Sequence, residues 1–347
     1  MKRLKKEFVV LLLLTISLIV FTSCKQNSKN TSTSSNSPTQ TNISGNLTLY
    51  TSQPDQDAQG LVKAFNEKYP DVKVNVFRSG TEEVVSKILA EKKSGKVMAD
   101  VVLLADAVTF ETLKENDLLQ SYDSPEATKI PKQFIDKDKM YYGTKLISTI
   151  IAINTQKVKT TPDSWKSLID PAAKGQVIMP SPLYSGAAAY NIGVLVRQKD
   201  FGWDFYKKLK SNGASVTQGN GGVIKAVASG EKPYGVVVDF MAAREKAKGS
   251  LINLVYPKEG VLAITEPVGI IKGTSNENAA KAFVDFILSK EGQSLEASMG
   301  YNPLREGVKP PAGLEEISKL KVLDYNIQEL YKSREEDKKK FSEIFSK

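Results

Sequence analysis

Two different spacings of hydrophobic residues alternate along the first half of the chain. A short strand-like segment at residues 47–50, an alternating apolar and polar segment at 72–77 and a buried apolar run at 99–105 are typical of β-strands. The segments between them place apolar residues at helical spacing, as at Leu61 and Phe65. A strand–helix order that repeats in this way favours a parallel sheet with helices on both faces. The pattern therefore predicts an α/β fold.

A second strand–helix series follows a long apolar run at residues 145–155. Residues 177–194 have the pattern of a strand, a proline-containing turn and an Ala-rich helix, and residues 234–238 form another apolar run. Residues 261–272 predict a strand that returns across the molecule, and an amphipathic helix at 279–288 should then pack on the first unit. We therefore expect two lobes, two crossover strands and a ligand cleft between the lobes.

Each predicted lobe is discontinuous in the sequence. Residues 46–148 and 264–305 are assigned to the first lobe, and residues 149–263 and 306–347 to the second. The C-terminal end predicts a docking helix, with the charge cluster at 334–340 as its solvated face.

The N-terminus has the pattern of an export signal. Basic residues precede a short apolar run and then small residues before Cys24, which predicts a signal peptide over residues 1–23. The small residues followed by cysteine resemble a bacterial lipobox, which implies lipidation of Cys24 and anchoring on the extracellular face of the cell membrane. The alternative is a generic signal peptide with an incidental cysteine. The polar segment 24–45 is expected to be a flexible tether.

Composition excludes several classes of site. The chain has no histidine and one cysteine, which rules out a Ser-His-Asp triad, a His-based zinc site and an intramolecular disulfide. The net charge is +9, but no basic stripe is interleaved with aromatic residues, so we expect no nucleic-acid partner. We also expect no cofactor and no resident metal. An extracellular enzyme that uses cleft carboxylates such as Asp106 and Asp239 remains the alternative from another class.

Polar residues follow the predicted strands at their carboxyl ends. Ser52, Asp106 and the pair Ser79 and Gly80 occupy such positions in the first series, and such ends line one crevice of an α/β sheet. Ser185 and Gly186 begin the Ala-rich helix of the second series, where the first backbone N–H groups of a helix attract anions.

These residues also have plainer interpretations. Ser79 and Glu82 fit a capping box, and Ser52 and Asp106 can simply cap helices. Asp239 can make a structural hydrogen bond. The Gly-rich stretch 219–222 lacks the spacing of a nucleotide-binding loop, and a simple turn is favoured over a nest of N–H groups.

Residues 47–106, LTLYTSQPDQDAQGLVKAFNEKYPDVKVNVFRSGTEEVVSKILAEKKSGKVMADVVLLAD, resemble the opening lobe of extracellular solute-binding proteins of ABC importers. SPLYSGAAAYNIG, AVASGEKPYGVVVD and NENAAKAFVDFILSKEGQ match later landmarks of the ferric-iron, thiamine, phosphonate and sugar-phosphate branch in the same order. The resemblance implies a two-lobed type II periplasmic-binding-protein-like fold, hinge closure on a solute and delivery to an ABC permease. We expect a monomer.

The resemblance and the strand ends together give a set of candidate ligand-binding residues. They are Ser52, Ser79, Gly80, Thr81, Asp106, Ser185, Gly186, Ala187, Thr217, Asp239 and Glu266. Hydroxyls and helix-start N–H groups suit a phosphate or phosphonate group, and a carboxylate at Asp239, Asp106 or Glu266 can pair with an amine or a sugar hydroxyl. We expect a small anionic solute, such as 2-aminoethylphosphonate or a phosphate ester.

Ferric iron is the alternative solute. Iron-binding members of the branch carry two adjacent tyrosines after the strand that corresponds to residues 234–238, and the matching positions here are Asp239 and Phe240. The Tyr141 and Tyr142 pair lies elsewhere, before the first crossover strand. The resemblance therefore favours the anionic solute over iron.

Overall fold

The structure, a computed structural model, describes residues 43–346. The strands are β1 (Gly45–Thr51), β2 (Val72–Arg78), β3 (Val101–Leu103), β4 (Leu119–Gln120), β5 (Tyr142–Asn154), β6 (Val177–Pro180), β7 (Ser215–Thr217), β8 (Tyr234–Val238), β9 (Ile252–Val255), β10 (Leu262–Ile271) and β11 (Asn302–Pro303). The predicted signal peptide, Cys24 and most of the predicted tether lie outside the described residues.

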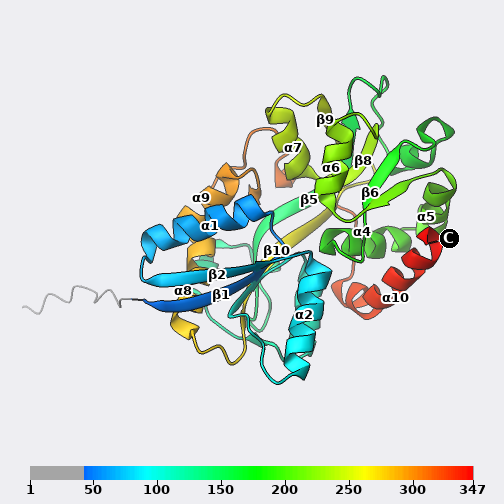
Figure 1. Cartoon of the computed structure of the whole chain (residues 1–347). Helices are drawn as coiled ribbons and strands as arrows, with labels where there is room; N and C mark the ends of the chain where they lie inside the picture. Colours follow the sequence, from blue (N-terminus) through cyan, green and yellow to red (C-terminus); the bar gives the residue numbers. More distant parts are fainter. Residues whose placement is uncertain (1–42, 347) are drawn as a thin grey trace, which may run out of the picture. The chain divides into compact units, whose positions relative to one another are not determined.

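One mixed sheet runs through both halves of the molecule in the order β2-β1-β3-β10-β5-β8-β6-β7 (Figure 1). The two ends of the sheet are parallel, with β1 between β2 and β3 and with β6 between β7 and β8. Strands β5 and β10 are antiparallel partners in the middle, and they are the two predicted crossover strands. Every residue of β5 is buried, as expected for a strand covered on both faces.

Helices cover this sheet on both sides. They are α1 (Asp55–Lys68), α2 (Thr81–Lys93), α3 (Ala107–Glu115), α4 (Gly186–Arg197), α5 (Gly202–Ser211), α6 (Asn220–Ala228), α7 (Asp239–Ala247), α8 (Glu277–Leu288), α9 (Lys290–Ser298) and α10 (Ile327–Phe345). We call β1–β4 with α1–α3, α8 and α9 the first lobe, and β6–β9 with α4–α7 the second lobe. The predicted α/β architecture with two lobes is confirmed.

The apolar face of α8 packs on the first lobe, as its periodicity predicted. Phe283 and Phe286 are fully buried and meet the ring of Phe65 on α1 at centroid distances of 5.0 and 5.7 Å. Such contacts bury large apolar surfaces, so this chain segment, distant in sequence, completes the core that β1 and β2 begin.

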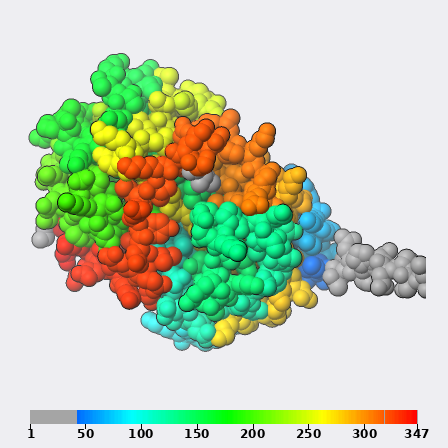
Figure 2. All heavy atoms as spheres, turned by 180° about the vertical axis from the view of Figure 1, so that it is seen from behind, coloured from blue at the N-terminus to red at the C-terminus, as the bar shows by residue number. Residues whose placement is uncertain are grey.

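Helix α10 lies beside α4 and α5 of the second lobe and also contacts α3 of the first (Figure 1). Seen from behind, the C-terminal part of the chain crosses the face between the two lobes (Figure 2). The prediction that 334–340 forms a solvated face is wrong for two of its residues. Arg334 and Asp337 are buried because each forms an ion pair with a neighbouring helix.

Candidate functional site

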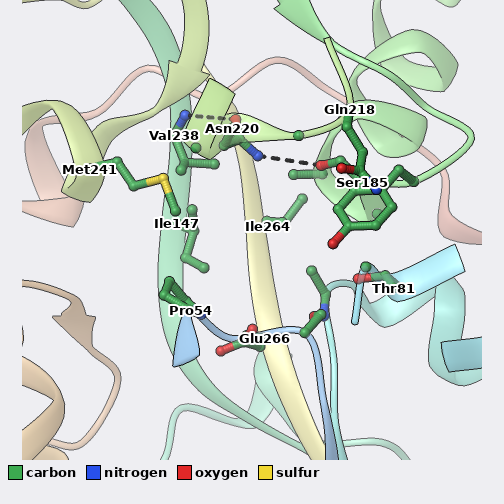
Figure 3. A pocket seen from close by; sticks show the side chains of 18 of the residues that line it. Pro54, Thr81, Ile147, Ser185, Gln218, Asn220, Val238, Met241, Ile264 and Glu266 are labelled. Atoms are coloured by element: carbon green, nitrogen blue, oxygen red, sulfur yellow. Dashed lines mark hydrogen bonds between the residues drawn. The ribbon is translucent and has the colours of Figure 1, made fainter. Parts of the chain in front are cut away.

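A pocket of about 300 Å³ lies between the two lobes and is lined from both of them and from β5 and β10 (Figure 3). This volume is at the lower end of the range for small-molecule sites in proteins. The pocket takes Ser52 and Thr81 from the first lobe, Ser185 and Asn220 from the second, and Glu266 from β10. A solute held here would touch both lobes at once.

Helices α2, α4 and α6 begin at the pocket wall. Helix α2 starts after Gly80 and α6 after Gly219, and neither start has a side-chain cap. Helix α4 starts after Ser185, whose hydroxyl accepts a hydrogen bond from the Ala188 N–H at 3.3 Å. The first N–H groups of each helix lack a partner within the helix and carry partial positive charge. Their convergence makes this end of the pocket suitable for an anion.

Arg78, the last residue of β2, adds a full positive charge to the pocket lining. Its Nε donates to the carbonyl oxygen of Gln53 at 2.8 Å, and its Nη1 lies 3.4 Å from the hydroxyl oxygen of Tyr184. Arg78 was not among the predicted ligand-binding residues. It stands one position before Ser79 at the same strand end, which is the signal that would have found it.

A buried charge cluster lies at the other end of the pocket, where Figure 3 shows Glu266 away from Ser185 and Asn220. The Lys145 Nζ lies 2.8 Å from Glu266 Oε2 and 2.9 Å from Glu296 Oε1, and all three side chains are almost fully buried. Burial raises the pKa of Glu266, although the Lys145 cation opposes the rise. With one cation for two carboxyl groups, this end is suited to a cationic or hydroxyl-bearing part of a solute.

The two lobes are in direct contact at the rim of the pocket. The Glu82 N–H of α2 donates to the carbonyl oxygen of Tyr184 at 3.3 Å. A Cβ added to Gly80 would lie 2.6 Å from that same oxygen, so only glycine permits this approach. The structure is therefore closed around the pocket.

Eight of the predicted ligand-binding residues line the pocket. They are Ser52, Gly80, Thr81, Ser185, Gly186, Ala187, Thr217 and Glu266. Their contact with a solute remains a prediction. Ser52 does not cap α1, because the N-cap of this helix is Pro54. The Ser52 hydroxyl instead accepts a hydrogen bond from the Ala105 N–H at 3.3 Å.

Ser79 lies outside the pocket lining, and the predicted capping box is wrong. Helix α2 begins one residue later than that box requires, with Gly80 as its N-cap. The Ser79 hydroxyl instead donates to the carboxylate of Glu83. The ring and carbonyl of Tyr184 pack directly over Gly80, which leaves no room for a side chain at the N-cap position of α2.

Asp106 also lies outside the lining, and it caps α3. Its carboxylate accepts from the Thr109 N–H at 2.9 Å, and the Thr109 hydroxyl accepts from the Asp106 N–H at 3.2 Å. The remaining oxygen lies 3.2 Å from Arg334 Nη1. Because these partners occupy the carboxylate, it is held away from the pocket.

Asp239 is buried behind the pocket rather than in its lining. Helix α7 begins at this residue, which turns the carboxylate toward β5, where Oδ1 accepts from the Ser148 N–H at 3.2 Å and from the Phe240 N–H at 2.8 Å. Burial raises the pKa of Asp239 to about 7, against the lowering effect of these hydrogen bonds. The next two residues, Phe240 and Met241, line the pocket in its place.

Sequence reasoning also missed other parts of the lining. Besides Arg78, Phe240 and Met241 these are Pro54, Ala105, Ile147, Tyr184, Gln218, Val238, Ile264, Tyr301 and the stretch 219–222. The favoured interpretation of 219–222 as a simple turn is wrong, because residues 220–222 form the first turn of α6 and line the pocket. Asn220 holds this start in place: its Oδ1 accepts from Val238 N–H at 3.4 Å and its Nδ2 donates to Ser185 Oγ at 3.3 Å (Figure 3).

None of the helices within residues 43–346 combines the length and the hydrophobicity that a membrane-spanning helix requires. The same residues hold no group of three or more His, Cys, Asp or Glu side chains arranged to bind a metal ion.

Comparison with known proteins places the chain among bacterial transport proteins. An uncharacterised protein of Haemophilus influenzae is 32% identical over 271 residues, 75% of this chain and 77% of the relative. Iron uptake protein A1 of Synechocystis is 25% identical and covers 76% of both chains. A periplasmic protein of Salmonella typhimurium, provisionally named for binding 2-aminoethylphosphonate, is 24% identical over 70% of this chain and 73% of its own.

The periplasmic binding protein AfuA of Actinobacillus pleuropneumoniae, solved with fructose-6-phosphate bound, is 27% identical. The match covers 87% of this chain and 99% of AfuA, with a TM-score of 0.81. The fold is thus that of the type II periplasmic binding proteins of ABC importers. Residues 96–331, most of the chain, match the family described as bacterial extracellular solute-binding protein. The chain belongs to this family.

Proposed function

We propose that this protein captures a small solute bearing a phosphate or phosphonate group and delivers it to an ABC permease. The observation that carries the proposal is the convergence of the starts of α2, α4 and α6 with Arg78 on one end of the pocket. Several N–H donors and a guanidinium match the several acceptor oxygens of a phosphoryl group.

The opposite end supports a solute with a second polar part. Glu266 lines the pocket, and only one cation, Lys145, offsets the charge of Glu266 and Glu296. An ammonium group or sugar hydroxyls would complement this end, as in an aminoalkylphosphonate or a sugar phosphate. AfuA with bound fructose-6-phosphate and the Salmonella relative named for 2-aminoethylphosphonate support this choice.

Capture proceeds by closure of the lobes. Only the closed arrangement brings the α2 start of the first lobe together with the α4 and α6 starts of the second, so the solute shifts the population toward the closed state. Lys and Glu side chains on the rims of both lobes then meet the permease.

We propose further that the protein works as a lipoprotein monomer on the extracellular face of the cell membrane. The segment before Cys24 supports lipidation there. Labelling of growing cells with an alkyne fatty acid should mark the wild type and leave Cys24→Ser unmarked. Labelling of Cys24→Ser would contradict the anchor.

The protein is proposed to bind rather than transform its solute. The pocket lining contains a single carboxylate, Glu266, and Asp106 and Asp239, the pair considered for acid–base chemistry, both lie outside the lining. Solute recovered unchanged after prolonged incubation with the protein is the expected result. Conversion to a product would establish the enzyme alternative.

Ferric iron is the second candidate, because two tyrosines, Tyr184 and Tyr301, line the pocket and phenolate oxygen is a ligand for iron. Iron uptake protein A1 of Synechocystis supports this reading. Against it, the Tyr301 hydroxyl donates to Asp57, and burial with nearby carboxylates raises the pKa of Tyr301 well above its ordinary value. Neither Tyr141 nor Tyr142 is in the pocket lining.

Thermal unfolding with a panel of solutes tests the proposal. The chain lacking residues 1–24 keeps the compact unit of residues 42–347 intact. We would compare 2-aminoethylphosphonate, sugar phosphates, thiamine phosphate, inorganic phosphate and ferric citrate. A solute at 100 times its Kd stabilises the folded state by about 2.7 kcal/mol. A shift with a phosphorus compound supports the proposal; a shift with ferric citrate alone, accompanied by a tyrosinate colour, replaces it with iron.

A further inference from the structure

Arg334 is a buried cation that does not line the pocket. It pairs with two carboxylates beside the anion end, which is the end of the pocket where α2, α4 and α6 begin. Its Nη2 lies 2.7 Å from Glu82 Oε1 and its Nη1 lies 3.2 Å from Asp106 Oδ2. Glu82 is the second residue of α2, and Asp106 is the N-cap of α3. The immediate neighbours of these two residues in the chain, Thr81 and Ala105, line the pocket.

Helix α10, which carries Arg334, is fixed to the second lobe. Arg197, the last residue of α4, places Nη1 2.7 Å from Asp337 and Nε 3.0 Å from Glu329, both on α10. Leu330 of α10 packs so closely on Gly193 of α4 that a Cβ there would lie 2.8 Å from its methyl carbon. Helix α10 therefore belongs to the second lobe by packing, while Arg334 reaches the first.

The Glu82 carboxylate that Arg334 meets is held in its charged form by its cationic partners. Burial alone would raise the pKa of Glu82, but Arg334 and Lys338 outweigh burial and hold that pKa below its ordinary value. Lys338 Nζ lies 2.6 Å from Glu82 Oε2. Without Arg334, the carboxylates of Glu82 and Asp106 would place negative charge one residue away from the pocket lining, where it would repel an anion.

We propose that Arg334 is a positioning residue for solute capture. It ties the starts of α2 and α3 to the second lobe in the closed state and, together with Lys338, offsets the charge of Glu82 and Asp106 beside the anion end. The effect on anion affinity rests on the proposed function, whereas the effect on closure does not. Opening the lobes separates Arg334 from both carboxylates. The attraction between these charges therefore opposes opening and is offset by the cost of removing them from water in the closed state.

Arg334→Met is the main test variant, with Lys332→Met as the matched control on the exposed face of α10. The probes are fructose 6-phosphate and inorganic phosphate, measured by titration calorimetry. Arg334→Met should weaken binding of the probe by about 5- to 150-fold, the usual range for coupled sites. Glu82→Gln combined with Arg334→Met should recover part of the lost affinity, because one of the exposed charges is gone.

A second readout follows the lobes without any ligand. In the chain lacking residues 1–24 no native cysteine remains, so labels at Lys93→Cys on α2 and Lys208→Cys on α5 report a single distance between the lobes. Arg334→Met should lengthen this distance in the unliganded protein, and Lys332→Met should not. Should Arg334→Met fail to fold, Arg334→Lys replaces it, because it keeps the charge but not the two-pronged contact.

The outcomes separate the two claims. A longer distance with weaker probe binding supports the proposal. An unchanged distance and affinity, with or without a lower melting temperature, overturns it and leaves Arg334 a structural residue only. If Glu82→Gln combined with Arg334→Met recovers no affinity, the claim that Arg334 acts by offsetting the carboxylate charge is overturned. If the wild type binds neither probe, the proposed function fails, and the distance alone decides whether Arg334 positions the lobes.

Discussion

Gly186 stands so close to the first lobe that a Cβ at this position would lie 2.5 Å from the carbonyl oxygen of Ala105. The two residues belong to different lobes, and both line the pocket. The contact exists only when the lobes are together. Closure of the lobes therefore requires glycine at position 186, whereas the fold of either lobe by itself does not.

Gly186→Ala should lower solute affinity while leaving stability almost unchanged. The added methyl group clashes with Ala105 only in the closed state, so the variant should remain open and bind about ten-fold or more weakly, for a cost of about 1.4 kcal/mol per factor of ten. Titration calorimetry measures the affinity. Gly60→Ala in α1, whose Cβ would make an ordinary 3.5 Å contact with Met299, is the control. Equal affinity in Gly186→Ala and wild type would refute the closed contact.

Lys145→Met should destabilise the folded protein strongly. The variant leaves Glu266 and Glu296 buried without their cation, and removal of one partner of a buried pair costs about 3–5 kcal/mol. Urea unfolding measures the change. Lys68→Met, which breaks an exposed pair with Glu291, should cost less than about 1 kcal/mol. A similar small cost for Lys145→Met would mean that the cluster is hydrated.

Asp239 should make stability depend on pH. Its folded pKa of about 7 exceeds that of an unfolded Asp, about 3.9, so the folded state binds more protons in this interval. Stability should therefore fall as pH rises from about 4 to about 7, by up to roughly 4 kcal/mol from this group.

Asp239→Asn keeps an oxygen for the N–H groups of Ser148 and Phe240 but cannot ionise. The stability of this variant relative to the wild type should consequently increase between pH 5 and pH 8. Urea unfolding at several pH values measures the difference. A difference that stays constant over this range would show that Asp239 titrates at its ordinary pKa.

Arg78→Gln should weaken the binding of a phosphate ester more at low salt than at high salt. The Arg78 guanidinium carries a full positive charge in the pocket lining, and dissolved salt screens its attraction for the phosphate group. Arg78→Lys retains the charge and should fall between Arg78→Gln and the wild type. If both variants lose affinity equally at every salt concentration, the hydrogen bond to Gln53 and not the charge is what matters.

The strand–helix order and one end of the pocket could be predicted from the sequence. Apolar periodicity located β5 and β10 as crossover strands. The strand end at Gly80 and the predicted helix start at Ser185 and Gly186 located these residues at the pocket. These features depend on local spacing, and the α/β geometry brings strand ends to one edge.

Other features depend on contacts that spacing does not contain. Asp239 and Phe240 are adjacent in the sequence. Because α7 starts at Asp239, the Asp239 carboxylate turns toward Ser148, whereas Phe240 lines the pocket. Arg334 was expected in water because it lies in a charge cluster. Its partners Glu82 and Asp106 are more than 200 positions away in the chain.

A matched pair of sugars shows whether the pocket holds a phosphoryl group. Titration calorimetry would compare fructose 6-phosphate with fructose, which differ by the phosphoryl group that the starts of α2, α4 and α6 and Arg78 are proposed to hold. We predict that fructose 6-phosphate binds and that fructose binds at least 100-fold more weakly, a difference of about 2.7 kcal/mol. Equal binding of the two sugars, or binding of ferric iron with neither sugar, would show that the pocket is not a phosphoryl-binding site.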